Sequence, residues 1–241
     1  MLVACAHGTG SAAGRRELAR LRLAVAAART GLEVVAAHAD VEVQRPGIAR
    51  VLTRLAERQQ ASVVVPLLLS TGYHVEQDIG DAVAAPAARG LAIAAAPLGP
   101  DELLIDVLVD RLRACGARRD DAVVLAAAGS RRPRAQADVA WTARRLAERW
   151  GAAVEVGYLA GAPSLGEVVT QLRARRPGVT VTLAAYLLAP SAFGDRLASA
   201  GADRVAAPLV GHPALIELTL ARYDQACREA RYSLQPRGDV R

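Results

Sequence analysis

An internal duplication constrains the fold of this 241-residue chain more than any other feature of its sequence. Up to residue 117, apolar runs of strand length alternate with longer stretches of helical composition, and the same succession begins again at residue 123. Strands that alternate with helices at this spacing predict βαβ units around a parallel sheet. A repeat of this length predicts two similar domains rather than a solenoid. We therefore expect an α/β protein with two similar doubly wound parallel-sheet lobes, residues 1–117 and residues 118–241, and a cleft between them.

The apolar runs of the first half are continuous, as in strands that are buried on both faces of a parallel sheet. The expected strands are residues 2–6, 32–40, 62–69 and 92–96, and the expected helices are residues 13–30, 46–59, 75–88 and 101–115. Pro46 stands at an expected first helical position, and Gly90 and Gly116 follow their helices as candidate C-caps.

Composition narrows the class of protein further. Hydrophobic residues make up 52% of the chain but aromatic residues only 3%, which favours helices packed on sheets over an aromatic-rich β-sandwich. The net charge of +6 falls in the second half, where it indicates either a solvated basic surface or attraction for a polyanionic ligand. With no long basic run and few aromatic residues, we do not expect a nucleic-acid-binding protein.

The cysteines, the N-terminal segment and the length of the apolar runs indicate the cellular compartment of the protein. Cys5, Cys115 and Cys227 are odd in number and far apart, which argues against a disulfide framework or a zinc knuckle. The N-terminus lacks a basic segment ahead of its apolar run, and no apolar run reaches the ~20 residues that span a bilayer. We therefore expect a cytoplasmic protein that is not associated with a membrane, and a two-lobed chain can form its cleft as a monomer.

Two histidines stand at equivalent positions, each just after an expected strand. His7 follows the first strand and His74 follows the third, at the edge where open α/β sheets bind ligands. Neutral imidazole binds divalent transition metals and accepts a proton near neutral pH. A histidine at a strand end can also be a local hydrogen-bonding or capping residue. In the second half, however, Ala128 and Phe193 occupy the matching positions, so the chemistry is expected in the first half.

Two charged residues follow the second strand at the same expected edge. Glu42 could complete a metal site or accept a proton from the substrate, or it could be an acid favoured by a helix N-terminus. Arg45 could bind a substrate carboxylate through two hydrogen bonds, or it could be an exposed loop arginine. In the second half Leu159 replaces Glu42.

The remaining candidates have simpler interpretations. We expect His38 to be a packed strand histidine, His212 to cap the last helix and Cys5 to be a small buried thiol. The loop of residues 8–11 offers backbone N–H groups for an anion, but it matches neither a Walker A loop nor a dinucleotide-binding fingerprint. The serines of the two loops lack the sequence of a hydrolase nucleophile elbow.

Taken together, these motifs resemble the sirohydrochlorin chelatases of the CbiX/SirB type, which are class II chelatases. The resemblance rests on three motifs and covers nearly the whole chain: His7-Gly8-Thr9, Glu42-x-x-x-Pro46, and Pro66-Leu67-Leu68-Leu69 leading through Gly72 to His74-x-x-x-Asp78-Ile79. It implies a chelatase-like fold and insertion of a divalent metal, Co²⁺ or Fe²⁺ and possibly Ni²⁺, into sirohydrochlorin for cobalamin or sirohaem biosynthesis. The enzyme would be a lyase without ATP or an organic cofactor.

The resemblance also implies roles for individual residues. His7 would be a metal ligand and proton acceptor, and His74 the second metal ligand. The positions implied to contact the tetrapyrrole are Arg45, Leu69, Ser70, Thr71, Gly72, Tyr73 and His74. Two other functions stay open, namely a non-catalytic carrier of tetrapyrrole or metal on the same scaffold, and a phosphate- or nucleotide-binding protein that uses the loop of residues 8–11.

Overall fold

A computed structural model describes residues 1–71, 74–85, 88 and 90–233, without the side chains of residues 74–76 and 231–233. The elements of its first half are β1 (Leu2–Ala6), α1 (Ala12–Ala28), β2 (Val34–His38), α2 (Ile48–Glu57), β3 (Ser62–Pro66), the π-helix η1 (His74–Ile79), α3 (Gly80–Ala84), β4 (Ala92–Ala94) and α4 (Glu102–Ala114). The elements of its second half are β5 (Ala122–Ala127), α5 (Pro133–Trp150), β6 (Val154–Tyr158), α6 (Leu165–Arg175), β7 (Val181–Tyr186), α7 (Gly194–Ala198), β8 (Arg204–Val205) and α8 (Ala214–Ser233).

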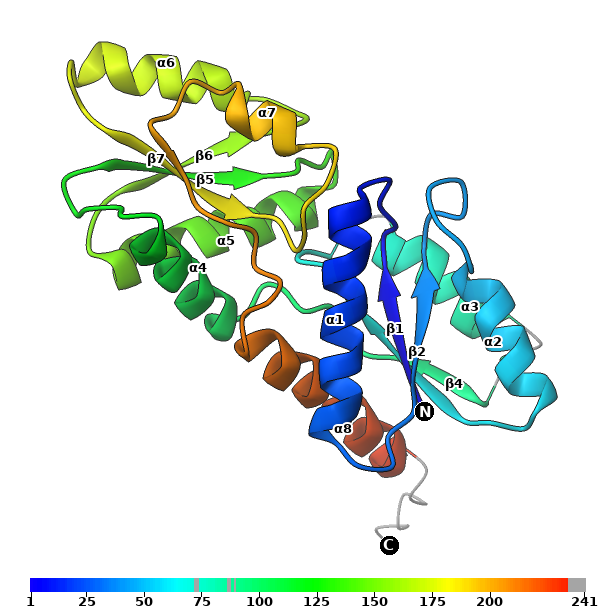
Figure 1. The fold of residues 1–241 in the computed structure, drawn as a ribbon. Helices are drawn as coiled ribbons and strands as arrows, with labels where there is room; N and C mark the ends of the chain where they lie inside the picture. Colours follow the sequence, from blue (N-terminus) through cyan, green and yellow to red (C-terminus); the bar gives the residue numbers. More distant parts are fainter. Residues whose placement is uncertain (72–73, 86–87, 89, 234–241) are drawn as a thin grey trace, which may run out of the picture.

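The strands form two four-stranded sheets with the same topology. Their orders are β2-β1-β3-β4 and β6-β5-β7-β8, and every neighbouring pair is parallel. The central strands β1 and β5 are fully buried, as their continuous apolar sequences predict. The predicted α/β class with two similar parallel-sheet lobes is therefore confirmed. Figure 1 shows the two sheets side by side with helices on their faces.

Three expected elements differ from the structure. The helix expected over residues 75–88 is instead η1 followed by the short α3, which ends where Ala85 turns to an extended backbone (ψ 143°), as is favoured before a proline. Pro46 is not a first helical position, because its carbonyl accepts the His38 N–H and α2 begins only after Gly47. Strand β3 ends at Pro66, so that residues 67–69 lie in a loop. Gly116 does follow α4, with φ 77°.

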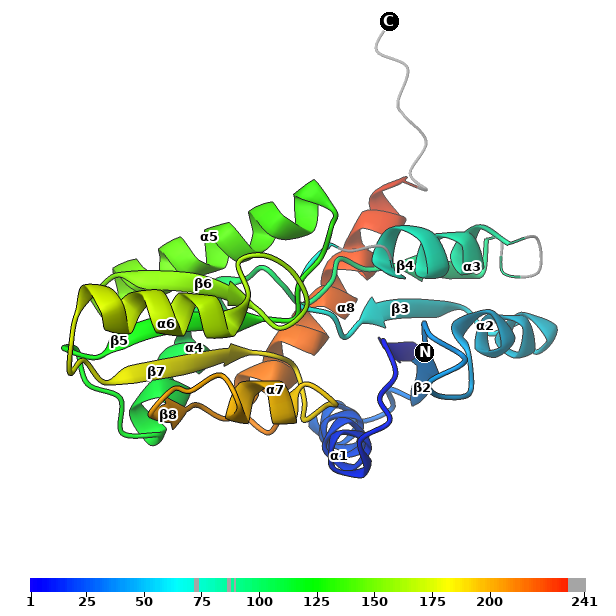
Figure 2. The same ribbon diagram turned by 90° about the horizontal axis from the view of Figure 1, so that it is seen from above.

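The two lobes exchange their last helices. Helix α4 belongs to the first half of the sequence but packs against α5 and β7 of the second, whereas α8 returns to pack against α1, β3 and β4 (Figures 1 and 2). The Arg145 Nε lies 2.6 Å from Glu102 Oε1 between α5 and α4, and the Arg29 guanidinium donates to Asp224 between α1 and α8. Each lobe of the structure therefore contains one helix from the other half of the sequence, so the two lobes in space are not the same as residues 1–117 and 118–241.

The exchange gives the lobes a common core. Its buried residues come from the facing sides of both sheets and from α1, α4, α5 and α8, for example Leu104, Leu146 and Leu215. Two separate clusters fill the outer faces, one around α6 and α7 and one around α2 and η1. The shared core fixes the carboxyl ends of the two sheets relative to each other. None of the described helices is long and apolar enough to cross a membrane.

Candidate active-site cleft

A cavity of about 510 Å³ lies between the two lobes, at the carboxyl ends of the central strands of both sheets. The first lobe contributes residues 6–9 and 67–70, and the second contributes residues 127–130 and 186–191. Ligand-binding crevices of open parallel sheets lie at this position. Among the predicted site residues that the structure describes, His7, Leu69 and Ser70 line this cavity.

His7 directly follows β1 and is half-buried in the cavity wall. Its Nδ1 atom lies 3.3 Å from the Gly8 carbonyl oxygen. If Nδ1 carries the proton and donates to that carbonyl, Nε2 keeps the lone pair that binds a metal or accepts a proton. The surroundings of His7 therefore suit the role predicted for it.

Neighbouring polar groups hold the loop of His7 in place. Gly8 adopts φ 114°, and a Cβ there would lie 3.2 Å from the Asp40 carbonyl oxygen, which explains a glycine at this position. The Thr9 N–H donates to Gln44 Oε1 at 3.1 Å, and Arg15 donates to the Thr9 carbonyl at 3.1 Å. Sequence reasoning missed Gln44, because a bond between residues 35 positions apart leaves no local signal.

Glu42 lies on the loop that packs against the loop of His7. The Asp40 carboxylate accepts the N–H groups of Glu42 at 3.0 Å and Val43 at 3.3 Å, which fixes the backbone of this loop. Glu42 itself is exposed and does not line the interlobe cavity. Its predicted role in proton transfer stays a prediction.

Arg45 lines a different cavity, of about 910 Å³, between α2 and the η1–α3 segment. Asp78 and Asp81 lie on the opposite wall of that cavity. The structure therefore does not bring Arg45 together with His7 in one cavity, and contact between Arg45 and a substrate carboxylate stays a prediction.

The loop from β3 to η1 carries the other predicted contacts. The Thr71 N–H donates to the Asp138 carboxylate of α5 at 2.7 Å. Gly72 and Tyr73 lie outside the described residues, and so does the side chain of His74, whose backbone begins η1. The pairing of His7 with His74 around a metal therefore stays a prediction. Among the described side chains, no group of three or more histidines, cysteines and acids could hold a metal ion.

The other histidines and Cys5 have structural roles, as predicted. His38 is 6% exposed, its Nδ1 lies 3.2 Å from the Pro46 carbonyl, and burial lowers its pKa. His212 Nδ1 accepts the Ala214 N–H at the start of α8. Burial, and to a smaller extent the Asp78 carboxylate, raise the pKa of Cys5 to about 12, which keeps this thiol protonated near pH 7.

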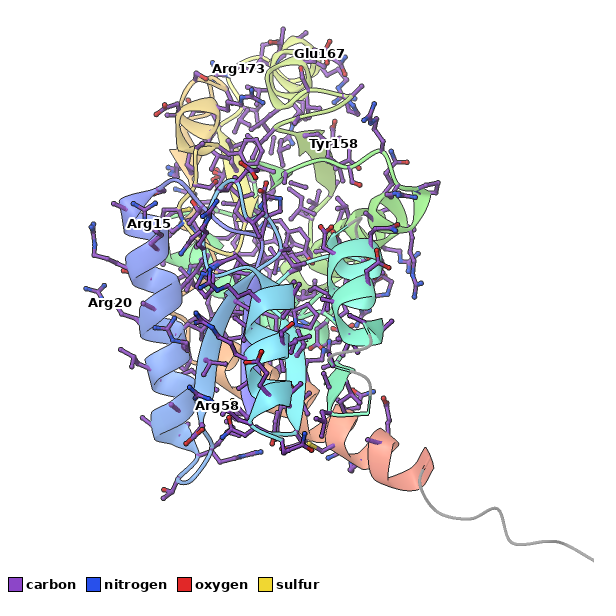
Figure 3. All side chains as sticks on the ribbon, turned by 90° about the vertical axis from the view of Figure 1, so that its right-hand side faces the viewer. Arg15, Arg20, Arg58, Tyr158, Glu167 and Arg173 are labelled. Carbon is purple, nitrogen blue, oxygen red and sulfur yellow. The ribbon has the colours of Figure 1, made fainter. Side chains whose placement is uncertain are left out.

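The second lobe supplies an apolar and aromatic wall. Tyr158, Tyr186 and Phe193 line the cavity opposite His7, together with Ser130 and Gln136. Figure 3 shows Tyr158 on the upper lobe, above the elements of the first lobe. A flat aromatic or macrocyclic ligand would find apolar contact on this wall and the imidazole on the other.

Two four-stranded parallel sheets with exchanged helices and a histidine on the wall of the interlobe cavity define a two-lobed α/β protein with a candidate ligand-binding cleft. The chain belongs to the CbiX family, because the CbiX family model matches residues 1–115 and 122–226. These two ranges correspond to the two halves of the internal duplication.

Solved structures support the fold. SirB from Bacillus subtilis with Fe³⁺ superposes with a TM-score of 0.80 at 22% identity, covering 96% of each chain. The sirohydrochlorin chelatase SirB from Bacillus subtilis subspecies spizizenii, in complex with cobalt, gives a TM-score of 0.78 at 20% identity over the same shares.

One curated relative is similar in sequence. A sirohydrochlorin cobaltochelatase from Sulfolobus acidocaldarius is 32% identical over 72 residues, which are 30% of this chain and 58% of the relative. The chain thus matches little more than half the length of this relative.

Proposed function

We propose that this protein inserts a divalent metal, Co²⁺ or Fe²⁺, into sirohydrochlorin without ATP. The observation that carries the proposal is the position of His7, which lies on the wall of the interlobe cavity in a chain of the CbiX family. The names of the similar proteins, which include a cobaltochelatase and chelatases with iron and cobalt, support the same substrates.

Metal insertion requires an ion that is partly stripped of water and two pyrrole protons that leave as the ion enters the ring. In the proposed mechanism His7 and His74 hold the ion and leave its other positions open for the ring nitrogens. As the metal–nitrogen bonds of the ring form, the bond between the ion and His7 breaks, the freed Nε2 lone pair accepts one pyrrole proton, and Glu42 accepts the other. The metal is a substrate, and the chain contributes the ligands and the proton acceptors.

The proposed binding of sirohydrochlorin uses both lobes. The macrocycle would contact Leu69, Ser70 and the rest of the loop to His74 on one side, and the aromatic wall of the second lobe on the other. Its carboxylates would meet Arg45 and the basic residues that dominate the second half.

The test is an anaerobic insertion assay followed by visible absorption, with a control lacking protein because cobalt inserts slowly by itself. Wild type should metallate many equivalents of sirohydrochlorin, whereas His7→Ala and His74→Ala should fall to the background rate. His212→Asn is the matched control, because asparagine also caps a helix and His212 lies at the start of α8 rather than in the cleft.

A carrier function is the alternative on the same scaffold. A carrier would bind the tetrapyrrole or the metal stoichiometrically, with no more metallated product than in the control. Wild-type protein that binds sirohydrochlorin without turnover would therefore replace the enzyme proposal by the carrier.

A further inference from the structure

The loop that leads from β3 to His74 is held by groups from the second repeat at two of its backbone positions. The Tyr186 hydroxyl donates to the Leu69 carbonyl at 2.7 Å, and the Thr71 N–H donates to Asp138 at 2.7 Å. Within the first repeat, the crossover to α4 contributes the Gly99 N–H, which donates to the Leu68 carbonyl at 3.2 Å. The contact of Thr71 with Asp138 falls three residues before His74 in the sequence.

The Tyr186 hydroxyl of the second repeat has no counterpart in the first repeat. Tyr186 ends β7, is 4% exposed and occupies the position that Leu67 holds in the first repeat. A buried hydroxyl needs a hydrogen-bond partner, and the Leu69 carbonyl supplies one. Burial raises the pKa of Tyr186. Thr142 lies one turn beyond Asp138 on α5, and its hydroxyl donates to the Asp138 carbonyl at 2.9 Å.

The predicted ligand His74 is present in the first repeat and replaced in the second, and the hydrogen bond that anchors its loop follows the same pattern. Pro190 stands three residues before Phe193, as Thr71 stands three residues before His74, and proline has no N–H to donate. Glu17 on α1 matches Asp138 on α5 and pairs with Arg20 of its own helix. The loop that carries the histidine is thus tethered to the opposite lobe through an N–H that the matching loop lacks.

We infer that Asp138 and Tyr186 are positioning residues. Through them the second lobe, on the other side of the cleft, fixes the position of His74 relative to His7. This inference rests on the proposed function for its effect on turnover. The second repeat, which has lost the ligands, then serves the reaction by fixing the loop that carries one of them. A displacement of catalytic groups by about 1 Å can cost up to about a hundredfold in rate, so loss of these tethers should lower kcat.

The test compares Asp138→Ala, Asp138→Asn and Tyr186→Phe with wild type and with Glu17→Ala as the matched control on α1. Asp138→Ala removes the acceptor for the Thr71 N–H, whereas the asparagine oxygen can still accept it. Asp138→Ala should lower kcat about ten- to a hundredfold, with faster hydrogen exchange at the Thr71 amide. Asp138→Asn should restore most of both values, and Tyr186→Phe should lower kcat in the same sense. Glu17→Ala should match wild type.

A second readout separates this inference from the proposed function. Each variant is titrated with Co²⁺ alone while its visible ligand-field absorption is recorded. If wild type inserts metal and Asp138→Ala does so equally well, the inference is wrong. If wild type inserts no metal, the proposed function fails, and weaker Co²⁺ binding by Asp138→Ala than by Asp138→Asn would still support the positioning role. Equal Co²⁺ binding by the two variants, or none by either, would overturn it.

Discussion

Replacing Gly99 by alanine would place a methyl group in the contact between the lobes. A Cβ at Gly99 would lie 2.3 Å from the Leu69 carbonyl oxygen and 2.6 Å from the Tyr186 hydroxyl. Because ordinary contacts of this kind begin near 3.4 Å, the loop of Leu69 would have to move by about 1 Å. Overpacking of this kind typically costs about 1–3 kcal/mol of the free energy of unfolding. For a chain of this size, a loss of about 2 kcal/mol lowers Tm by roughly 4–8 °C.

The same displacement should lower the rate of metal insertion, because it moves the loop that leads to His74. We expect Gly99→Ala to reduce kcat by up to about a hundredfold at a temperature where the variant is folded. Gly166→Ala is the matched control, since no atom lies within 4 Å of a Cβ there and the position is inside α6. Alanine is preferred over glycine in a helix, so this control should keep the wild-type kcat and lose no stability. Scanning calorimetry and the insertion assay measure both effects. A Gly99→Ala protein with the Tm and kcat of wild type would refute the packing argument.

Two further substitutions test the stability of the fold. Asp121 is 5% exposed, and its Oδ2 accepts hydrogen bonds from Thr182 and Arg204, both at 2.9 Å. Asp121→Ala should therefore lower the free energy of unfolding, measured by urea titration, by about 3 kcal/mol. A decrease of less than about 1 kcal/mol would contradict this prediction. Burial lowers the pKa of His38, so the unfolded chain takes up a proton below its ordinary pKa of 6.5 more readily than the folded one. The contribution of His38 to stability is thus present above pH 6.5 and declines as the pH falls below it, and His38→Asn should unfold with a shallower pH dependence between pH 7 and pH 5. An unchanged slope would show that His38 is protonated equally in both states.

Much of the fold could be predicted because it depends on local sequence. The run from Leu2 to Ala6 is continuous and apolar, and it forms the buried central strand with the expected bounds. The strand ends then place His7 at the ligand-binding edge, since parallel strands share that edge. The position of His7 in the cleft follows from these two local facts.

The features that sequence patterns did not predict depend on distant contacts. Nothing near α4 indicates that it packs on the sheet of the other half, because its apolar face would suit either sheet. The tether between Thr71 and Asp138 joins residues 67 positions apart, and each is unremarkable in its own segment. Arg45 and His7 both follow strands of one sheet, which predicts a common edge for them, but Arg45 lines a separate cavity next to α2.

Turnover of sirohydrochlorin by wild type and by His7→Ala is the measurement that tests the central claim most directly. Both proteins receive Co²⁺ or Fe²⁺ at matched free concentrations, and the metallated product per protein molecule is followed anaerobically. We expect many equivalents from wild type and only the rate of the protein-free control from His7→Ala. Equal turnover by the two proteins would contradict the role given to His7 and the site built around it.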